Sequence, residues 1–335
     1  MNTNVKTIGV LTSGGDAPGM NAALRGVVRA AESKGILVKG IEEGFEGLLH
    51  GKVRLMDRSS VRDIINHGGT ILNSSRSKDF REIAGQETGA KACQIFGLDA
   101  LVVIGGDGSF AGAYELSKLG VNVICIPATI DLDVVSTEYT IGFDTACNTT
   151  IDILSKLRDT TASHQRCSIV EVMGRRAGYI ALKTAIACGA DYCVIPENGP
   201  YNMEKIAKHI HKRRDLGKRH HIIIVAEGAL KNTDGTEKTI DEFAKELSEA
   251  TGIEARGSDT GHILRGGNPS CTDCVCASMF GVKAIDIIMQ GEKNRVLAYK
   301  DNKIVSYPID KALKMKKTID KEMWDCFATL AEIDD

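Results

Sequence analysis

Short apolar runs alternate with segments whose apolar residues recur at helical spacing along most of this 335-residue chain. Such runs are typical of strands buried on both faces of a parallel sheet, and the periodic segments are typical of the helices that cover it. We expect strands at 7–12, 37–41, 101–104, 123–126, 168–172, 192–195 and 222–226. Because one sheet does not hold so many strands comfortably, the predicted fold class is α/β. It has two doubly wound Rossmann-like domains with parallel sheets and a cleft between them.

The helical spacing places helices between these strands. Helices are expected at 20–34, 59–66, 144–158, 177–188, 202–215 and 240–251, with two more that end near 96 and 119. The glycine-rich residues 44–47 are expected to form a loop. Residues 295–299 and 303–308 are expected to pair as a hairpin with its turn at 301–302.

Hydroxyl and acidic side chains directly follow the strand at 123–126. Pro127 ends that strand because it has no N–H to donate, and Thr129, Asp131 and Asp133 come next. In extended chain these three side chains point to one side, with Leu132 opposite and the Cα atoms of the acids roughly 6.5–7 Å apart. Open α/β sheets bind ligands at such strand ends, so this segment is a candidate site. The alternative is a capping turn in which Thr and Asp serve hydrogen bonding alone.

Two glycine-rich loops also follow predicted strands and open helices, so both present backbone N–H groups to phosphate. The first, Gly14–Gly19, has the outer spacing of a P-loop but lacks its final Lys-Ser/Thr. The second, Gly105–Ala111, weakly matches the dinucleotide fingerprint of oxidoreductases, yet Asp107 within it would repel a bare pyrophosphate. An acid there is explained if it holds Mg²⁺, which in turn holds the phosphates. Purely structural glycines are the other explanation.

Arginines are a further sign of phosphorylated ligands, because a guanidinium binds phosphate oxygens in a bidentate manner. Five arginines lie beside glycine, serine or a strand end: Arg76, Arg166, Arg175, Arg256 and Arg265. Each alone would be a solvated surface residue, but together with the glycine loops they indicate substrates that carry several phosphates. His262 is either a core histidine or a hydrogen-bond donor to a sugar.

Charge and hydropathy exclude several classes of function. A formal net charge of −2 argues against nucleic acid or an anionic membrane as the main partner. The basic run 208–221 is expected to be the polar face and end of a helix. No apolar stretch approaches the roughly 18–20 residues of a membrane span, and residues 1–6 lack the apolar core of a signal peptide. We therefore expect a cytoplasmic protein.

The ten cysteines lie mostly in apolar segments, where cysteine behaves as a small hydrophobic residue in a reducing compartment. Cys271, Cys274 and Cys276 have the spacing of half a metal site. No second Cys/His pair of matching spacing follows, so incidental or reactive thiols are expected rather than a structural metal.

Six segments resemble, in the same order, those of the bacterial-type 6-phosphofructokinases, and the likeness runs over essentially the whole chain. They are G-V-L-T-S-G-G-D-A-P-G-M-N-A (9–22), V-V-I-G-G-D-G-S (102–109), P-A-T-I-D-L-D (127–133), S-H-Q-R (163–166), V-E-V-M-G-R (170–175) and G-H-I-L-R-G-G (261–267). One segment alone is weak, since G-G-D-G also occurs in NAD kinases and lipid kinases. The resemblance implies ATP-dependent phosphorylation of D-fructose 6-phosphate at its 1-hydroxyl, the committed step of glycolysis.

The resemblance also implies a role for each matching residue. Asp131 matches the catalytic base and Asp107 the acid associated with Mg²⁺. The other matches to the catalytic set are Thr129, Asp133 and Arg175. The ATP site is matched by Gly15, Phe45 (against the adenine), Arg76, Ser77, Gly106, Asp107, Gly108 and Ser109. The fructose 6-phosphate site is matched by Thr129, Asp131, Arg166, Met173, Gly174, Arg175, Glu227, Arg256, His262 and Arg265.

The resemblance further implies an assembly. Arg166 and Arg256 match arginines that reach the sugar site from a neighbouring subunit, so a homotetramer is expected. An effector site for ADP or phosphoenolpyruvate is matched by Arg25, Arg29, Arg158, Asp191 (in place of a glutamate that helps to hold effector magnesium) and Lys218. Leu216 replaces a lysine of that cluster, which leaves allosteric control open. The nucleotide domain is expected at 1–142 with 264–312, and the sugar-phosphate domain at 143–263 with 313–335.

Three positions bear on the phosphoryl donor or on activity. Pyrophosphate-using relatives carry Asp in place of Gly108 and Lys in place of Ala128, so the donor is expected to be ATP. The usual family segment P-G-T-I-D-N-D is altered here at Ala128 and Leu132. The Ala128 methyl would crowd phosphate or require unfavourable backbone angles. Leu132 lacks the side-chain amide that could orient the neighbouring acids. The alternative is therefore a catalytically weak regulatory paralogue that binds phosphorylated ligands.

Overall fold

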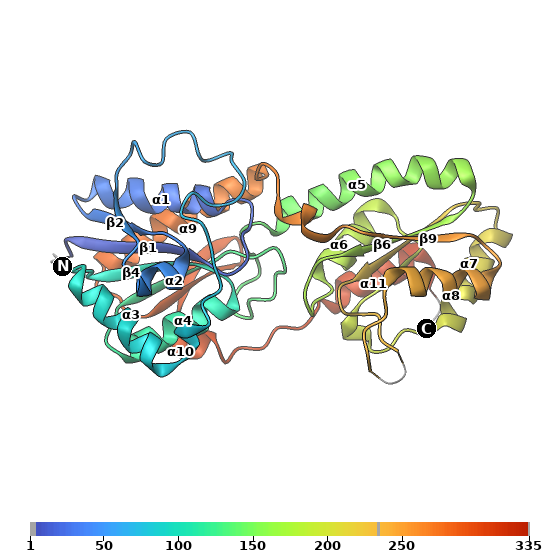
Figure 1. The fold of residues 1–335 in the computed structure, drawn as a ribbon. Coiled ribbons are helices and arrows are strands. Elements are labelled where there is room, and N and C mark those ends of the chain that lie inside the picture. The colour runs from blue at the N-terminus through green and yellow to red at the C-terminus, as the bar shows by residue number, and fades with distance from the viewer. Residues whose placement is uncertain (1–4, 233–234, 334–335) are drawn as a thin grey trace. The chain divides into compact units, whose positions relative to one another are not determined.

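The chain folds as two α/β units, each built from two separate stretches of sequence (Figure 1). The computed structural model describes residues 5–232 and 235–333, so most of the 1–6 stretch lies outside the described residues. Unit 1 comprises Met1–Thr145 and Arg265–Lys317, and unit 2 comprises Ala146–Leu264 and Thr318–Asp335. The boundaries expected from the sequence lie one to five residues from these.

Unit 1 is organised on a seven-stranded sheet with the order β11-β10-β5-β4-β1-β2-β3. Its strands are β1 (Thr7–Ser13), β2 (Leu37–Ile41), β3 (Val53–Met56), β4 (Ala100–Gly105), β5 (Val123–Pro127), β10 (Arg295–Lys300) and β11 (Lys303–Pro308). The central strands are parallel, and β3 and β11 are antiparallel edges. The expected hairpin is confirmed as β10–β11. Its turn residues Asp301 and Asn302 both have positive φ, as the common two-residue hairpin turn requires.

The two longest helices of unit 1, α1 (Met20–Ser33) and α9 (Cys271–Met289), lie side by side on one face of this sheet (Figure 1). Their backbones touch at two glycines. A Cβ on Gly26 would lie 2.8 Å from the Ser278 carbonyl oxygen, and one on Gly281 would lie 2.5 Å from that of Ala23. Both contacts are with backbone, which cannot move aside as a side chain can.

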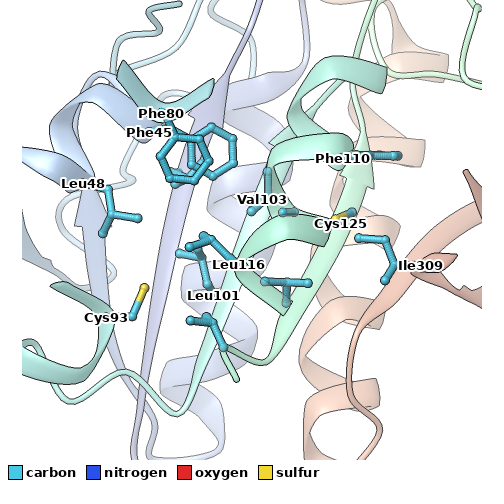
Figure 2. Close-up of a cluster of buried hydrophobic side chains, with 14 of the residues drawn as sticks. Phe45, Leu48, Phe80, Cys93, Leu101, Val103, Phe110, Leu116, Cys125 and Ile309 are labelled. Carbon is cyan, nitrogen blue, oxygen red and sulfur yellow. The ribbon is translucent and has the colours of Figure 1, made fainter. Parts of the chain in front are cut away.

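A hydrophobic cluster fills the other face of the sheet, beneath α2 (Gly44–Leu49), α3 (Ile83–Ile95), α4 (Asp107–Lys118) and α10 (Ile309–Ala312) (Figure 2). Leu101, Val103 and Leu116 are fully buried within it. The rings of Phe45 and Phe80 stack there with centroids 4.2 Å apart. Each such side chain contributes about 1.5–3 kcal/mol by leaving water, so the cluster fixes the strands from which the candidate loops emerge.

Unit 2 has a four-stranded parallel sheet with the order β7-β8-β6-β9. The strands are β6 (Cys167–Val172), β7 (Tyr192–Val194), β8 (His221–Ala226) and β9 (Ala255–Asp259). The main helices are α5 (Phe143–His164), α6 (Tyr179–Cys188), α7 (Met203–Asp215), α8 (Ile240–Thr251) and α11 (Lys321–Ala331). α8 starts with a reciprocal capping box of Thr239 and Glu242. The two sheets confirm the predicted α/β class.

Two local predictions are wrong, and two strands were missed. Residues 59–66 form turns, with Asp63 at positive φ, instead of a helix. Residues 44–47 belong to α2, because burial of Phe45 and Leu48 outweighs the low helix propensity of the glycines. The strands β3 and β9 were not predicted, since each is short and largely polar or exposed.

The cysteines lie in different surroundings. All ten cysteines lie in the described residues as free thiols. Cys271 is exposed, Cys276 is buried, and the Cys274 thiol donates to the Ile65 carbonyl at 3.4 Å. Over residues 5–232 and 235–333 there is no group of three His, Cys, Asp or Glu side chains that could hold a metal ion. In the same residues no helix is long and apolar enough to cross a membrane.

The close contact of α1 and α9 predicts that Gly281→Ala destabilises unit 1. Alanine favours a helix by about 1 kcal/mol, but the backbone clash costs about 1–3 kcal/mol, so we expect a net loss of up to about 2 kcal/mol. Urea unfolding followed by circular dichroism measures it. The control is Val282→Ala on the exposed side of the same helix. Equal stabilities of the two variants would contradict the close contact.

Candidate functional site

Three loops of unit 1 leave the sheet at the same edge, because β1, β4 and β5 are parallel neighbours. The register pairs Ser13 with Gly105 and Gly105 with Pro127. Side-chain and backbone bonds then join the loops: Ser109 Oγ donates to the Ser13 carbonyl at 3.0 Å, and the Ala128 N–H donates to the Gly105 carbonyl at 2.9 Å. The predicted loops after these strands are therefore one structural feature.

The segment after β5 is a turn, so the extended spacing predicted for Thr129, Asp131 and Asp133 is wrong. The Asp131 N–H donates to Thr129 Oγ1 at 3.2 Å, and Thr140 Oγ1 donates to the Thr129 carbonyl at 2.7 Å. Asp131 is 6% exposed and Thr129 8%, while Asp133 is half-buried. The alternating arrangement is lost because Leu132 adopts a left-handed conformation with φ 56°. We call residues 128–133 the catalytic turn, after the role that the resemblance implies for Asp131.

The two unusual residues of this turn behave differently from what the sequence suggested. Ala128 has no positive φ and its methyl is fully buried, so the concern about its backbone angles is wrong. Leu132 is the strained residue: a left-handed conformation costs a typical side chain roughly 1–2 kcal/mol, while Asn adopts it readily. The left-handed backbone thus explains why asparagine suits this position. The predicted alternation of side chains along an extended segment does not explain it.

Asp273 of α9 holds the segment that follows the catalytic turn, and sequence reasoning missed it. Its fully buried carboxylate accepts bonds from Tyr139 Oη (2.5 Å), Gly142 N (2.7 Å), Thr145 N (2.8 Å) and Thr145 Oγ1 (2.5 Å). Burial raises the pKa of this carboxyl, and the four hydrogen bonds oppose the rise. The sequence signal that could have identified Asp273 is an acid within the first turn of an otherwise apolar helix.

The glycine loop after β4 continues directly into α4, whose first residue is Asp107. Asp107 and Gly108 are exposed, and Ser109 is 5% exposed. A Cβ on Gly106 would lie 3.5 Å from that of Thr129, so this loop borders the catalytic turn, whereas one on Gly108 would meet nothing within 4 Å. A helix start attracts anions. One exposed carboxylate fits Mg²⁺, which proteins hold through one or two carboxylates together with phosphates.

The first glycine loop lies against a residue from the far end of the sequence. Arg265 Nη1 donates to the Asp16 carbonyl at 3.2 Å, and a Cβ on Gly15 would lie 2.7 Å from the same nitrogen. Gly15 and Arg265, predicted for different ligands, are thus neighbours in unit 1. Arg76 is exposed, and Ser77 Oγ accepts the Phe80 N–H at 3.1 Å.

The ring of Phe45, which the resemblance places against the adenine, is largely covered in this structure. Its ring is 6% exposed and stacks on Phe80, with an interplanar angle of 12° (Figure 2). Since one face is covered by Phe80 and the ring lies in the hydrophobic cluster, little of it is available to a nucleotide base. We therefore leave Phe45 out of the ATP site.

In unit 2, Glu227 binds the backbone of the loop after β6. Its Oε2 accepts the N–H of Gly174 at 3.2 Å and that of Arg175 at 2.7 Å. Arg175 is exposed and has φ 61°, and Met173 is half-buried. The carboxylate thus positions the loop that presents Arg175, a role that the sequence did not predict.

Glu171 of β6 is a second acid that sequence reasoning missed. Burial, together with the nearby carboxylates of Asp259 and Glu227, raises its pKa to about 7. Asp259 lies directly opposite Glu171 in the β6–β9 pairing. This part of unit 2 therefore combines acids with the arginines assigned to phosphate.

Arg166 and Arg256 share one carboxylate oxygen of unit 2. Arg166 Nη1 lies 3.6 Å and Arg256 Nε 2.8 Å from Glu254 Oε1. Glu254 therefore brings together the two arginines that the resemblance assigns to a neighbouring subunit's site. His262 is exposed in the short helix Gly261–Arg265, so it is not a core histidine.

The predicted effector residues fall into two groups. In unit 1, Arg25 and Arg29 line a surface pocket between α1 and α9 with Asp286. Burial lowers the pKa of Arg25, as does the nearby Arg29. In unit 2, Arg158 donates to the Cys188 carbonyl.

Asp191 is a buried acid that is paired within unit 2. It is 2% exposed, lies 2.6 Å from Lys218 Nζ, and accepts the Ile222 N–H at 3.0 Å. Burial would raise its pKa, but hydrogen bonds to His221 and Lys218 lower it to about 2. In this structure, therefore, the carboxylate that the resemblance assigns to effector magnesium is paired with the ammonium of Lys218.

Comparisons with known proteins agree with this geometry. The family model described as phosphofructokinase matches residues 7–288. The chain is 48% identical over 328 residues to an ATP-dependent 6-phosphofructokinase of Clostridium botulinum, covering 98% of this chain and all of that one. It is 50% identical over 321 residues to an ATP-dependent 6-phosphofructokinase of Clostridium acetobutylicum, covering 96% and 98%.

A solved structure of phosphofructokinase from Saccharomyces cerevisiae superposes with a TM-score of 0.87 at 32% identity. That match covers 97% of this chain and 48% of the yeast chain, so this chain spans about half the yeast protein's length. From the family match and the near full-length identity, we conclude that this chain belongs to the phosphofructokinase family.

Proposed function

We propose that this protein transfers the γ-phosphoryl group of ATP to the 1-hydroxyl of D-fructose 6-phosphate, giving fructose 1,6-bisphosphate and ADP. The observation that carries the proposal is the catalytic turn, where Asp131 is fixed beside the glycine loop that opens α4. The names of the Clostridium relatives support ATP as donor and argue for the enzyme over the regulatory paralogue.

Asp131 is the proposed general base. A carboxylate held by a backbone turn accepts the proton of the sugar hydroxyl as that oxygen attacks phosphorus, and Thr129 fixes its orientation through the Asp131 N–H. Asp133 and Arg175 complete the proposed catalytic set, Arg175 by neutralising charge on the transferred group. Such catalysis consists mainly of positioning and charge neutralisation.

The donor is assigned to the loops of unit 1. The N–H groups at the start of α4 bind phosphate oxygens, with Gly15, Arg76, Ser77, Gly106, Gly108 and Ser109 as the lining residues. Asp107 would hold Mg²⁺, which neutralises the charge of the phosphates when bound. Gly108 leaves open the space that an acid would fill in a pyrophosphate-dependent relative.

The acceptor is assigned to Arg175, Glu227, His262 and Arg265 with Met173 and Gly174, the arginines binding the 6-phosphate. Arg166 and Arg256, held together by Glu254, are proposed to serve the site of a neighbouring subunit in a homotetramer. We further propose a cytoplasmic enzyme with no nucleic-acid or membrane partner. ADP or phosphoenolpyruvate would act through Arg25, Arg29, Arg158 and Lys218.

Asp131→Asn tests the base. The amide keeps the shape of the turn but accepts no proton, so we expect kcat to fall by about 10²–10⁴-fold with little change in KM. An aldolase-coupled assay with ATP and fructose 6-phosphate measures both constants. Normal turnover by a folded variant would remove Asp131 from this role.

Gly108→Asp tests donor recognition. The position has no neighbour within 4 Å and no positive φ, so the carboxylate is accommodated and repels the nucleotide phosphates. We expect kcat/KM for ATP to fall by at least ~100-fold. Gly108→Ala adds a Cβ without charge and is the matched control, expected within about threefold of wild type. Equal losses of kcat/KM in both variants would show that side-chain bulk, and not charge, determines ATP recognition at this position.

Leu132→Asn tests the weak-paralogue alternative. Asn relieves the left-handed strain but exchanges a buried apolar side chain for an amide, so we expect stability to change by less than about 1 kcal/mol. Because no step uses the Leu132 side chain, kcat should stay within about threefold of wild type. A rise of tenfold or more would favour the weak paralogue.

A further inference from the structure

Lys317 reaches the catalytic turn from the end of unit 1. It is the last residue of the Arg265–Lys317 stretch, where the chain passes into unit 2. Its Nζ donates to the Leu132 carbonyl at 2.8 Å and to the Thr137 carbonyl at 2.9 Å. One ammonium group thus joins both ends of the segment that directly follows Asp131.

The two carbonyls need a protein donor because their segment is buried. Leu132 is 8% exposed, Val134 1% and Thr137 3%. A buried carbonyl that loses its donor costs about 1–3 kcal/mol. Leu132 lies beyond the end of β5, so Lys317 supplies a bond that the sheet does not.

The charge of Lys317 responds to pH. Burial lowers its pKa to about 8, and the carboxylates of Asp133 and Glu138 oppose the change. Both acids belong to the segment that Lys317 binds, and Glu138 also accepts the Asp301 N–H of the β10–β11 turn at 3.2 Å. Below about pH 8 the ammonium is charged and its hydrogen bonds are strongest. Above that pH the neutral amine donates more weakly.

We propose that Lys317 is a positioning residue for phosphoryl transfer, whose protonated side chain fixes the turn that carries Asp131. This inference rests on the proposed function. Lys317 acts on the geometry of the base and not on substrate contacts. Turnover should therefore respond to Lys317 and to its protonation, while the KM values should not.

The test compares Lys317→Met, Lys317→Arg and the exposed neighbour Lys316→Met in the full-length protein. Loss of the ammonium misplaces the base, so Lys317→Met should lower kcat at pH 7 by about 10–100-fold, with KM values unchanged within threefold. Wild-type kcat should fall above about pH 8. Lys317→Arg should keep activity and lose this alkaline fall, since arginine stays charged. Lys316→Met should match wild type.

Hydrogen–deuterium exchange of the 131–137 segment is the second readout and needs no turnover. Faster exchange in Lys317→Met than in Lys316→Met is expected. A wild-type protein without kinase activity would contradict the proposed function. The exchange result would still show whether Lys317 holds the 131–137 segment in place. Unchanged exchange, or a Lys317→Met enzyme with wild-type kcat and pH profile, would overturn the role of Lys317.

Discussion

The parallel register of β1, β4 and β5 is the constraint on which the candidate site depends. Parallel neighbours end at one edge of a sheet, so three loops from distant parts of the sequence meet there. The buried cluster beneath α3 and α4 keeps these strands in register, and the Ser109–Ser13 and Ala128–Gly105 bonds tie the loops together. The glycine loop that opens α4 and the turn that carries Asp131 thereby become neighbours.

The catalytic turn is held from several directions by residues far from it in sequence. Thr140 binds the Thr129 carbonyl, and Asp273 fixes the segment from Tyr139 to Thr145. Lys317 binds the carbonyl of Leu132, the residue that follows Asp131. Such support permits the strained backbone of Leu132, which a free loop would relax. A well-supported turn also explains how the chain keeps a candidate base in place despite departing from the usual family segment.

The sequence predicted the α/β class, most strands and most helices, because burial on both faces and helical spacing leave a direct hydrophobic signature. It also predicted that Thr129 and Asp131 follow β5. It could not predict the turn conformation, since the left-handed Leu132 follows from tertiary bonds and not from local preference. For the same reason it missed Asp273, whose carboxylate is satisfied by distant backbone groups. It also did not predict that Phe80 covers the ring of Phe45.

The central claim is that this arrangement uses ATP to phosphorylate fructose 6-phosphate. The most direct measurement is an aldolase-coupled assay of the purified wild-type protein with fructose 6-phosphate and Mg²⁺, comparing ATP with pyrophosphate. The open space at Gly108 and the ATP-dependent relatives predict turnover with ATP and none with pyrophosphate. Turnover with pyrophosphate alone, or silence with both donors in folded protein, would contradict the account.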